Sequence, residues 1–161
     1  IEEVISETLG FLEREAKNRG VKLEAELPPN LPEIVSDRGQ LQQVFLNIVG
    51  NALDALAGGE GSTQTQQGEE RFVKIRCQSQ NGQMLVSVQD NGKGMSPEVL
   101  RHIFEPFYST KKDKGTGLGM FITYGIVRKL GGEIHVQSEE GRGSTISITL
   151  PLTPPDVAVE V

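Results

Sequence analysis

The chain has 161 residues, of which 36% are hydrophobic and 24% charged, a balance typical of a globular protein with a buried core. Its formal net charge of −6 argues against nucleic-acid binding, because phosphate backbones are bound by clustered Lys and Arg. No apolar run reaches the ~20 residues that a membrane helix needs, and the single cysteine, Cys77, excludes an internal disulfide and fits a reducing compartment.

The first half of the chain predicts a helix, a strand and a second helix. Residues 1–19 carry apolar side chains at helical spacing, and Gly20 follows them in the position that commonly ends a helix. Residues 21–27 alternate apolar and polar residues, as a half-buried strand does. Prolines then break the pattern, and a second helix is expected over residues 38–56, with Asp37 as its N-cap.

The middle of the chain predicts a loop followed by a hairpin. Residues 57–70 are rich in Gly and Gln and carry no apolar residue beyond one alanine, which is typical of a flexible surface loop. Two strands are expected over residues 71–79 and 83–90. The Asn81-Gly82 pair between them is a strong signal for a tight hairpin turn.

The last part of the chain predicts a helix and two more strands after an irregular stretch. Residues 95–116 show no sustained periodicity. A helix is expected over residues 117–130, strands over 133–138 and 143–152, and a frayed tail over 153–161. This order of elements predicts one α+β domain, with helices on one face of a mixed sheet.

One face of the second predicted helix is polar and carries Gln43, Asn47, Asn51 and Asp54. The simplest interpretation is a solvated face. However, Asn is a poor helix former, and solvated faces normally carry Lys and Glu. Asn47 and Asn51, one turn apart, would aim two amides at one point, where their oxygens suit a Mg²⁺ ion that also binds substrate phosphates.

The segment DNGKGMS, residues 90–96, follows a predicted strand and allows two interpretations. It lacks the G-x-x-x-x-G-K-[ST] spacing of a P-loop. As a plain turn, its Asp-Asn-Gly run needs no ligand. As a site, Gly92 and Gly94 would let the backbone approach a planar ligand, and Asp90 would accept a hydrogen bond from the amine of adenine. The same carboxylate would repel the carbonyl oxygen of guanine, so such a site would select ATP over GTP.

A second glycine-rich run, KKDKGTGLGM at residues 111–120, opens a predicted helix. It does not match the G-x-G-x-x-G pattern of a dinucleotide-binding fold. Free N–H groups and the helix dipole favour an anion at such a start, and Lys111, Lys112 and Lys114 add positive charge to an acidic chain. The alternative is a run of charges that is merely solvated.

Between the two glycine segments lies the aromatic run IFEPFYST, which contains Phe104, Phe107 and Tyr108. The whole chain has only six Phe and two Tyr, so this concentration of rings in an irregular stretch requires a reason. Either the rings pin a loop onto the core, or they form an exposed patch that docks a partner.

Four motifs stand in a fixed order: NIVGNALDA, DNGKGMS, FEPFYST and GTGLGM. Together they resemble the ATP-binding catalytic domain of two-component sensor histidine kinases, in the superfamily that includes DNA gyrase, MutL and heat-shock chaperone ATPases. The resemblance covers residues 1–152. It implies a two-layer α/β sandwich of the Bergerat type, with a mixed sheet of about five strands, helices on one face and a mobile ATP lid over residues 95–116.

The resemblance also assigns roles to individual residues. Asn47 and Asn51 resemble the paired asparagines of the family, with Asn51 the Mg²⁺ ligand. Asp90 resembles the residue that reads the adenine amine, with Thr145 in support, and Lys111 is similar to a lid lysine that contacts phosphates. The nucleotide-binding residues implied in this way are Asn47, Asn51, Asp54, Asp90, Gly92, Gly94, Met95, Lys111, Gly115, Thr116, Gly117, Leu118, Gly119 and Thr145.

Two features depart from the family or limit what the chain can do. Many members carry Lys and an aromatic residue where this sequence has Asp54 and Ala55. The phosphate-accepting His of the family lies on a helical dimerisation domain, and neither His102 nor His135 has that context. No catalytic residue is therefore assigned to this chain.

The resemblance implies a Mg-ATP-binding module that donates the ATP γ-phosphoryl group to a histidine on a dimerisation domain absent from this chain. A response regulator would receive the phosphoryl group in a later step. A cytoplasmic location follows, without direct membrane contact by this domain, whether or not the parent protein is membrane-anchored.

Three alternatives use the same fold. Anti-sigma-factor kinases phosphorylate a serine on a partner, but their sequences lack FEPFYSTK followed by GTGLGM in this form. MutL-type ATPases activate water with a helix-borne acid, for which Asp54 would be the candidate, although they need further dimerising domains. A structural domain with a degenerate pocket is the third alternative, and nucleotide titration separates it from the others.

Overall fold

A computed structural model describes residues 1–57, 65, 68–111 and 115–155 of the chain. Most of the loop predicted over residues 57–70 therefore lies outside the described residues, as do Lys112, Lys114 and most of the predicted tail. In the described part of the chain, no helix is long and apolar enough to cross a membrane.

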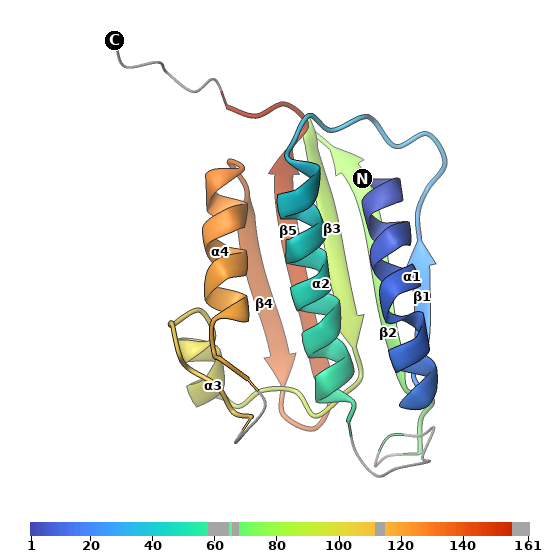
Figure 1. Ribbon diagram of the computed structural model, residues 1–161, viewed down its shortest axis with the longest axis vertical. Helices are drawn as coiled ribbons and strands as arrows, with labels where there is room; N and C mark the ends of the chain where they lie inside the picture. The colour runs from blue at the N-terminus through green and yellow to red at the C-terminus, as the bar shows by residue number, and fades with distance from the viewer. Residues whose placement is uncertain (58–64, 66–67, 112–114, 156–161) are drawn as a thin grey trace.

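A five-stranded mixed sheet forms one layer of the structure, with the strand order β1-β2-β3-β5-β4 (Figure 1). β1 pairs with β2 in parallel, and the remaining neighbours are antiparallel. The strands are β1 Lys22–Glu26, β2 Phe72–Gln80, β3 Gln83–Asp90, β4 Glu133–Glu139 and β5 Gly143–Pro151. This arrangement confirms the predicted α+β sandwich and its mixed sheet.

The second layer consists of helices, and α1, α2 and α4 lie side by side across one face of the sheet (Figure 1). The helices are α1 Glu2–Asn18, α2 Arg38–Ala55, α3 Pro97–His102 and α4 Gly119–Lys129. Helix α2 occupies the centre of the layer, so it can contact both neighbouring helices and the sheet beneath it.

The predicted start of α2 and the predicted end of α1 are confirmed, and each is marked by a capping residue. The Asp37 carboxylate accepts a hydrogen bond from the Gln40 backbone N–H at 2.9 Å and caps α2, and Gly20, with φ at 65°, ends α1. The predicted start of the last helix at Gly117 is wrong. Gly117 has a left-handed φ of 67°, which a right-handed helix cannot include, so α4 begins at Gly119.

The predicted hairpin between β2 and β3 is confirmed. Asn81 and Gly82 both have positive φ, at 53° and 73°, which a tight turn between twisted strands requires. The turn fixes the register, and it places Asp90 at the end of β3 opposite Val73.

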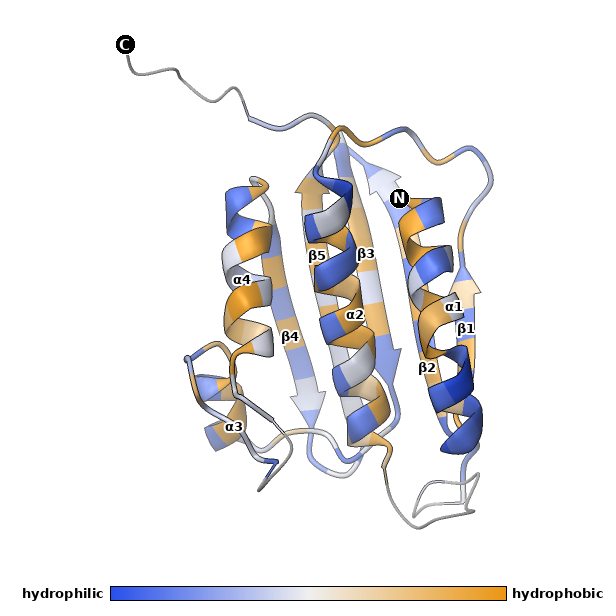
Figure 2. Ribbon diagram, viewed as in Figure 1, coloured by the Kyte–Doolittle hydropathy of each residue, from blue (hydrophilic) through white to orange (hydrophobic). Residues whose placement is uncertain are grey.

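The core lies between the helices and the sheet, because alternate residues of each central strand face the helices. On β3 the buried side chains are Met84, Val86, Val88 and Asp90. Figure 2 shows the alternation of hydrophobic and hydrophilic residues along β4. Asp90 thus continues an apolar series into a region where a charged residue requires a special reason.

Replacing Phe45 by Ala tests this core. Phe45 is fully buried on the central helix α2, so we expect the loss of its ring to lower the free energy of unfolding by about 3–5 kcal/mol. Urea denaturation measures the change. The control is Phe11→Ala on α1, where the side chain is 68% exposed, and this variant should stay within about 0.5 kcal/mol of the parent. Equal losses in the two variants would contradict the assigned core.

Candidate nucleotide-binding site

A cavity of about 870 Å³ lies among α2, the ends of β3 and β5, the segment that follows β3, and the start of α4. Its volume is in the range of small-molecule sites. Of the residues predicted to bind nucleotide, those that line it are Asn51, Asp54, Asp90, Gly94, Met95, Lys111, Gly115, Thr116, Gly117 and Gly119. Apolar side chains of Ile48, Ala52, Val88, Met120 and Ile146 line it as well.

Asp90 is a buried carboxylate in the wall of this cavity, with a relative exposure of only 6%. Its Oδ1 atom accepts a hydrogen bond from the Gly92 backbone N–H at 2.9 Å. Desolvation raises the pKa of Asp90 from its ordinary value of 3.8 to about 6, although backbone hydrogen bonds from Gly92 and Ser144 partly oppose this rise. Near neutral pH the group is therefore still an anion that can accept further hydrogen bonds.

The structure places Ser144, and not Thr145, beside Asp90. The register of β3 and β5 pairs Asp90 directly with Ser144, and Ser144 lines the cavity. Thr145 pairs with Gln89, so its side chain points to the opposite face of the sheet. The period of two along a strand could have indicated this, since Ser144 shares a face with the buried Ile146, Ile148 and Leu150.

Gly92 and Gly94 clear space for the protein's own backbone. A Cβ atom on Gly92 would lie 2.5 Å from the Ala55 carbonyl oxygen at the end of α2. A Cβ atom on Gly94 would lie 2.0 Å from the Glu139 carbonyl oxygen, and Gly94 also has a φ of 65°. Both glycines do allow a close approach, as predicted. However, the groups that come close to them are backbone carbonyls of the protein, where the sequence predicted a planar ligand. Of the two residues, only Gly94 lines the cavity.

Gly117 plays a similar part at the other glycine segment. A Cβ atom there would lie 2.4 Å from the Phe107 carbonyl carbon, and the Phe107 N–H donates to the Gly117 carbonyl oxygen at 3.0 Å. This contact folds the aromatic segment against the start of α4. Leu118 is the N-cap residue of α4 and does not line the cavity.

The two asparagines of α2 have different surroundings. The Asn47 amide nitrogen donates to the Gly119 carbonyl oxygen at 3.3 Å and to the Thr123 hydroxyl at 3.2 Å, so it ties α2 to α4 and does not line the cavity. The Asn51 amide oxygen accepts a hydrogen bond from the Lys111 ammonium at 3.3 Å inside the cavity. Of the two asparagines, only Asn51 presents its amide oxygen to the cavity, where the sequence predicted both.

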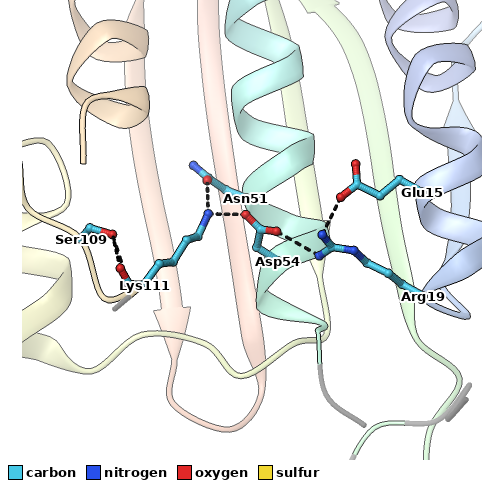
Figure 3. A network of polar contacts seen from close by, with 6 residues as sticks. All are labelled: Glu15, Arg19, Asn51, Asp54, Ser109 and Lys111. Atoms are coloured by element: carbon cyan, nitrogen blue, oxygen red, sulfur yellow. Dashed lines mark hydrogen bonds and ion pairs between the residues drawn. The ribbon is translucent and has the colours of Figure 1, made fainter. Parts of the chain in front are cut away.

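A chain of charged groups runs from the cavity to α1 (Figure 3). The Lys111 ammonium forms an ion pair with Asp54 Oδ2, and Asp54 Oδ1 accepts a hydrogen bond from Arg19 at 2.9 Å. Arg19 also pairs with Glu15 at 2.5 Å. Desolvation raises the pKa of Asp54, but the contacts with Lys111 and Arg19 outweigh it, so this pKa lies below its ordinary value.

Arg19 is a cavity residue that the sequence did not indicate. It lies just beyond the last turn of an amphipathic helix, where a cation is expected in any case because of the helix dipole. Only the packing of α1 against α2 brings its side chain to Asp54, and no local sequence signal reports that packing.

The three aromatic residues of the FEPFYST segment have three different environments. Phe104 packs its ring against Tyr124 of α4, with ring centroids 5.1 Å apart, and Tyr108 lines the cavity. Phe107 is 76% exposed and has a left-handed φ of 65°, which is unusual for a bulky residue. Phe104 therefore pins the segment against α4, whereas Phe107 forms part of an exposed surface.

Comparisons with known proteins agree with this geometry. Residues 36–154 match the family described as histidine kinase-, DNA gyrase B-, and HSP90-like ATPase. The chain is 36% identical to Sporulation kinase E of Bacillus subtilis strain 168 over 152 residues, which make up 94% of this chain and 19% of that protein. The chain spans between 16% and 30% of the length of the three curated relatives compared first.

Solved structures share the fold. The catalytic domain of histidine kinase ThkA superposes with a TM-score of 0.78 at 28% identity, over 96% of this chain and 93% of that chain. ThkA has also been solved in complex with the response regulator protein TrrA, with a TM-score of 0.74, 26% identity, and coverage of 96% of this chain and 41% of that chain. Full-length ShkA in complex with AMPPNP gives a TM-score of 0.78 at 28% identity, over 94% of this chain and 30% of that chain.

The fold and the family match thus define an ATP-binding α+β sandwich, and the cavity lies between its helix layer and its sheet. The chain belongs to the family of histidine kinase-, gyrase- and HSP90-like ATPases, in which it is the ATP-binding catalytic domain of a sensor histidine kinase.

Because the pKa of Asp90 is raised in the folded protein, the free energy of unfolding should depend on pH through this residue. A carboxyl group whose pKa is higher in the folded state contributes stability that is present in full below about pH 3.8 and is lost as the pH rises through about 6. Asp90→Asn is neutral at every pH, so at pH 7 we expect it to be more stable than the parent by about 1–3 kcal/mol, and below pH 4 to be equal to it. Thermal unfolding at both pH values measures this.

The matched control is Asp37→Asn, which should show no gain at pH 7. Hydrogen bonds from the Gln40 backbone and side chain hold the pKa of Asp37 below its ordinary value, which reverses the sign of its contribution. A pH-independent difference between Asp90→Asn and the parent would contradict the assigned cause.

Proposed function

We propose that this domain binds Mg-ATP in the cavity and presents the γ-phosphoryl group for transfer to a histidine of a separate dimerisation domain of the same kinase. The observation that carries the proposal is Asp90, a buried anion in a largely apolar part of the cavity wall. A buried carboxylate requires a donor, and within the described residues only backbone N–H groups reach it. The amine of adenine would complete its hydrogen bonding.

The adenine end of the site would lie against Asp90, Ser144 and the neighbouring apolar side chains. Val88 and Ile146 flank Asp90 on the same face of the sheet, and Ile48 and Ala52 face them from α2. These surfaces suit a flat, uncharged base, while the carboxylate distinguishes an amine from a carbonyl oxygen. Guanine would place an acceptor against an acceptor, which costs the full desolvation of both.

The phosphate end would lie at the start of α4. The first N–H groups of any helix have no intrahelical partner, and in the described part of the chain no side chain caps those of α4. Gly119 and Met120 line the cavity there. Gly115 and Gly117 line the same wall, and the Lys111 ammonium reaches into the cavity. Free N–H groups, the helix dipole and a cation together favour a polyphosphate.

The residues present fit a magnesium ion bound jointly with phosphate. The Asn51 amide oxygen faces the cavity and is the oxygen donor type that Mg²⁺ prefers. The described residues contain no group of three or more His, Cys, Asp or Glu side chains that could hold a metal, so phosphate oxygens and water would supply the other ligands. When bound, the ion would neutralise charge that develops on the transferring phosphoryl group.

This domain would position the phosphoryl donor, while the acceptor would come from elsewhere. His135 is exposed on β4 and lies near Glu133, and His102 ends the short helix α3 beside Glu105. Neither side chain lines the cavity. Phosphoryl transfer depends mainly on positioning and charge stabilisation, which the residues around the cavity could supply. A response regulator would receive the phosphoryl group afterwards and would contact this domain only indirectly.

The proposal extends to domain limits, lid and location. Residues 1–152 would form the catalytic domain, and residues 95–116 would form a lid whose ordering by the phosphates gates the reaction. The docking face for the dimerisation domain would include Phe107 together with Phe121 and Tyr124, which are exposed on α4. The domain would act in the cytoplasm, without nucleic-acid or direct membrane contact, and the buried free thiol of Cys77 fits a reducing compartment.

Calorimetric titration with ATP and GTP, each with and without Mg²⁺, tests the site. We expect ATP to bind more tightly with Mg²⁺ and GTP to bind at least tenfold more weakly, because Asp90 would face its carbonyl oxygen. Asp90→Asn should lower ATP affinity at least tenfold while remaining folded. Equal affinity for the two nucleotides would exclude Asp90 as the base-reading residue, and absence of binding by folded protein would mean a degenerate pocket.

The docking face is tested by Phe107→Asn, which removes the exposed ring but keeps a residue type that tolerates positive φ. Transfer of labelled phosphate from ATP to the kinase's own dimerisation domain, supplied as a separate polypeptide, should fall at least about tenfold, with ATP affinity unchanged. Phe11→Asn, which removes a ring of similar exposure from α1, is the control and should transfer normally. Equal rates in both variants would remove Phe107 from the interface.

A further inference from the structure

Two oxygen atoms on α2 hold one cation inside the cavity. The Lys111 ammonium contacts both the Asn51 amide oxygen, at 3.3 Å, and the Asp54 carboxylate. Asn51 and Asp54 are three residues apart on a helix, so their side chains share a face. All three residues line the cavity, and Figure 3 shows their side chains pointing toward one another. The cavity therefore contains a two-oxygen cation site, which in this structure is filled by the protein's own ammonium group.

The chemistry of these two oxygens suits Mg²⁺. Proteins commonly bind Mg²⁺ through one or two carboxylates together with substrate phosphates. Asn51 supplies a neutral oxygen, and Asp54 adds the charged oxygen that such sites normally include. The ion and the ammonium could not share these two oxygens, because their like charges would lie only a few ångströms apart.

The Asp54 carboxylate is also oriented by a second hydrogen bond, as carboxylates that ligate metals usually are. Arg19 donates to Oδ1 of Asp54 at 2.9 Å, whereas the ammonium pairs with Oδ2. Arg19 is itself fixed by Glu15 at 2.5 Å. Carboxylates that ligate metals are typically oriented by such outer hydrogen bonds, which leave one oxygen for the ion. Exchange of one cation for another at Oδ2 would leave this support in place.

We propose that Asp54 is a second protein ligand of the nucleotide-bound Mg²⁺, and that the ion takes the place beside Asn51 which the Lys111 ammonium holds in this structure. The displaced Lys111 ammonium then turns to the phosphates. The inference rests on the proposed function, since it concerns the metal that accompanies ATP.

The test compares ATP affinity in excess Mg²⁺ with ATP affinity in EDTA, by calorimetry, for the parent and for variants of Asp54. The ratio of the two dissociation constants reports the contribution of the metal. We expect Asp54→Asn and Asp54→Ala to reduce this ratio at least tenfold, and affinity in EDTA to be unchanged or higher because a negative charge near the phosphates is gone. Asp54→Glu, which keeps a carboxylate, should retain much of the ratio.

Glu13→Gln is the matched control. It removes a carboxylate that pairs with Lys17 on the outer surface of α1, away from the cavity, and should keep the parental ratio. A parental ratio in both neutral variants of Asp54 would overturn the inference. An equal loss of affinity with and without Mg²⁺ would also overturn it, since Asp54 would then support the pocket as a whole. Failure of the parent to bind ATP in either condition would instead overturn the proposed function.

Discussion

The rest of the structure depends on close backbone packing around the segment that follows β3. The end of α2 contacts this segment from one side, and the turn between β4 and β5 contacts it from the other. The distances at Gly92 and Gly94 leave no room for a Cβ atom against Ala55 and Glu139. Glycine at these two positions is therefore what allows the helix layer to close onto the sheet there. This closure buries Asp90 and forms one wall of the cavity, so a packing constraint of the fold creates the polar feature on which the proposed recognition of adenine depends.

Two aspartates in the cavity wall differ in environment, and the difference separates their proposed roles. Asp90 is buried, and within the described residues only backbone donors reach it, so desolvation raises its pKa and its carboxylate remains available to a ligand. Asp54 is partly exposed and compensated by Lys111 and Arg19, so it stays ionised and already holds a cation. The Asp90 carboxylate is suited to accepting a hydrogen bond from a neutral base, and the Asp54 carboxylate to binding a cation near a polyphosphate.

Much of the fold was predictable because its signals are local. Asp37 caps α2, Gly20 ends α1, and Asn81-Gly82 closes the hairpin, each through a conformation that one or two residues dictate. Many of the residues that line the cavity were predicted for the same reason, since their motifs mark helix starts and strand ends. The start of α4 was misplaced because the left-handed conformation of Gly117 results from its contact with Phe107.

By itself, the sequence determined the class of fold, the positions of the helices and strands, and the family to which the chain belongs, because periodicity, caps and motif order are properties of neighbouring residues. Only the tertiary structure decided which side chains share the cavity. Alternation along β5 indicates the face that Ser144 shares, but only strand register put it opposite Asp90 in place of Thr145, and helix packing brought Arg19 to Asp54. These choices depend on contacts between segments far apart in the chain, where burial and hydrogen bonding override local preference.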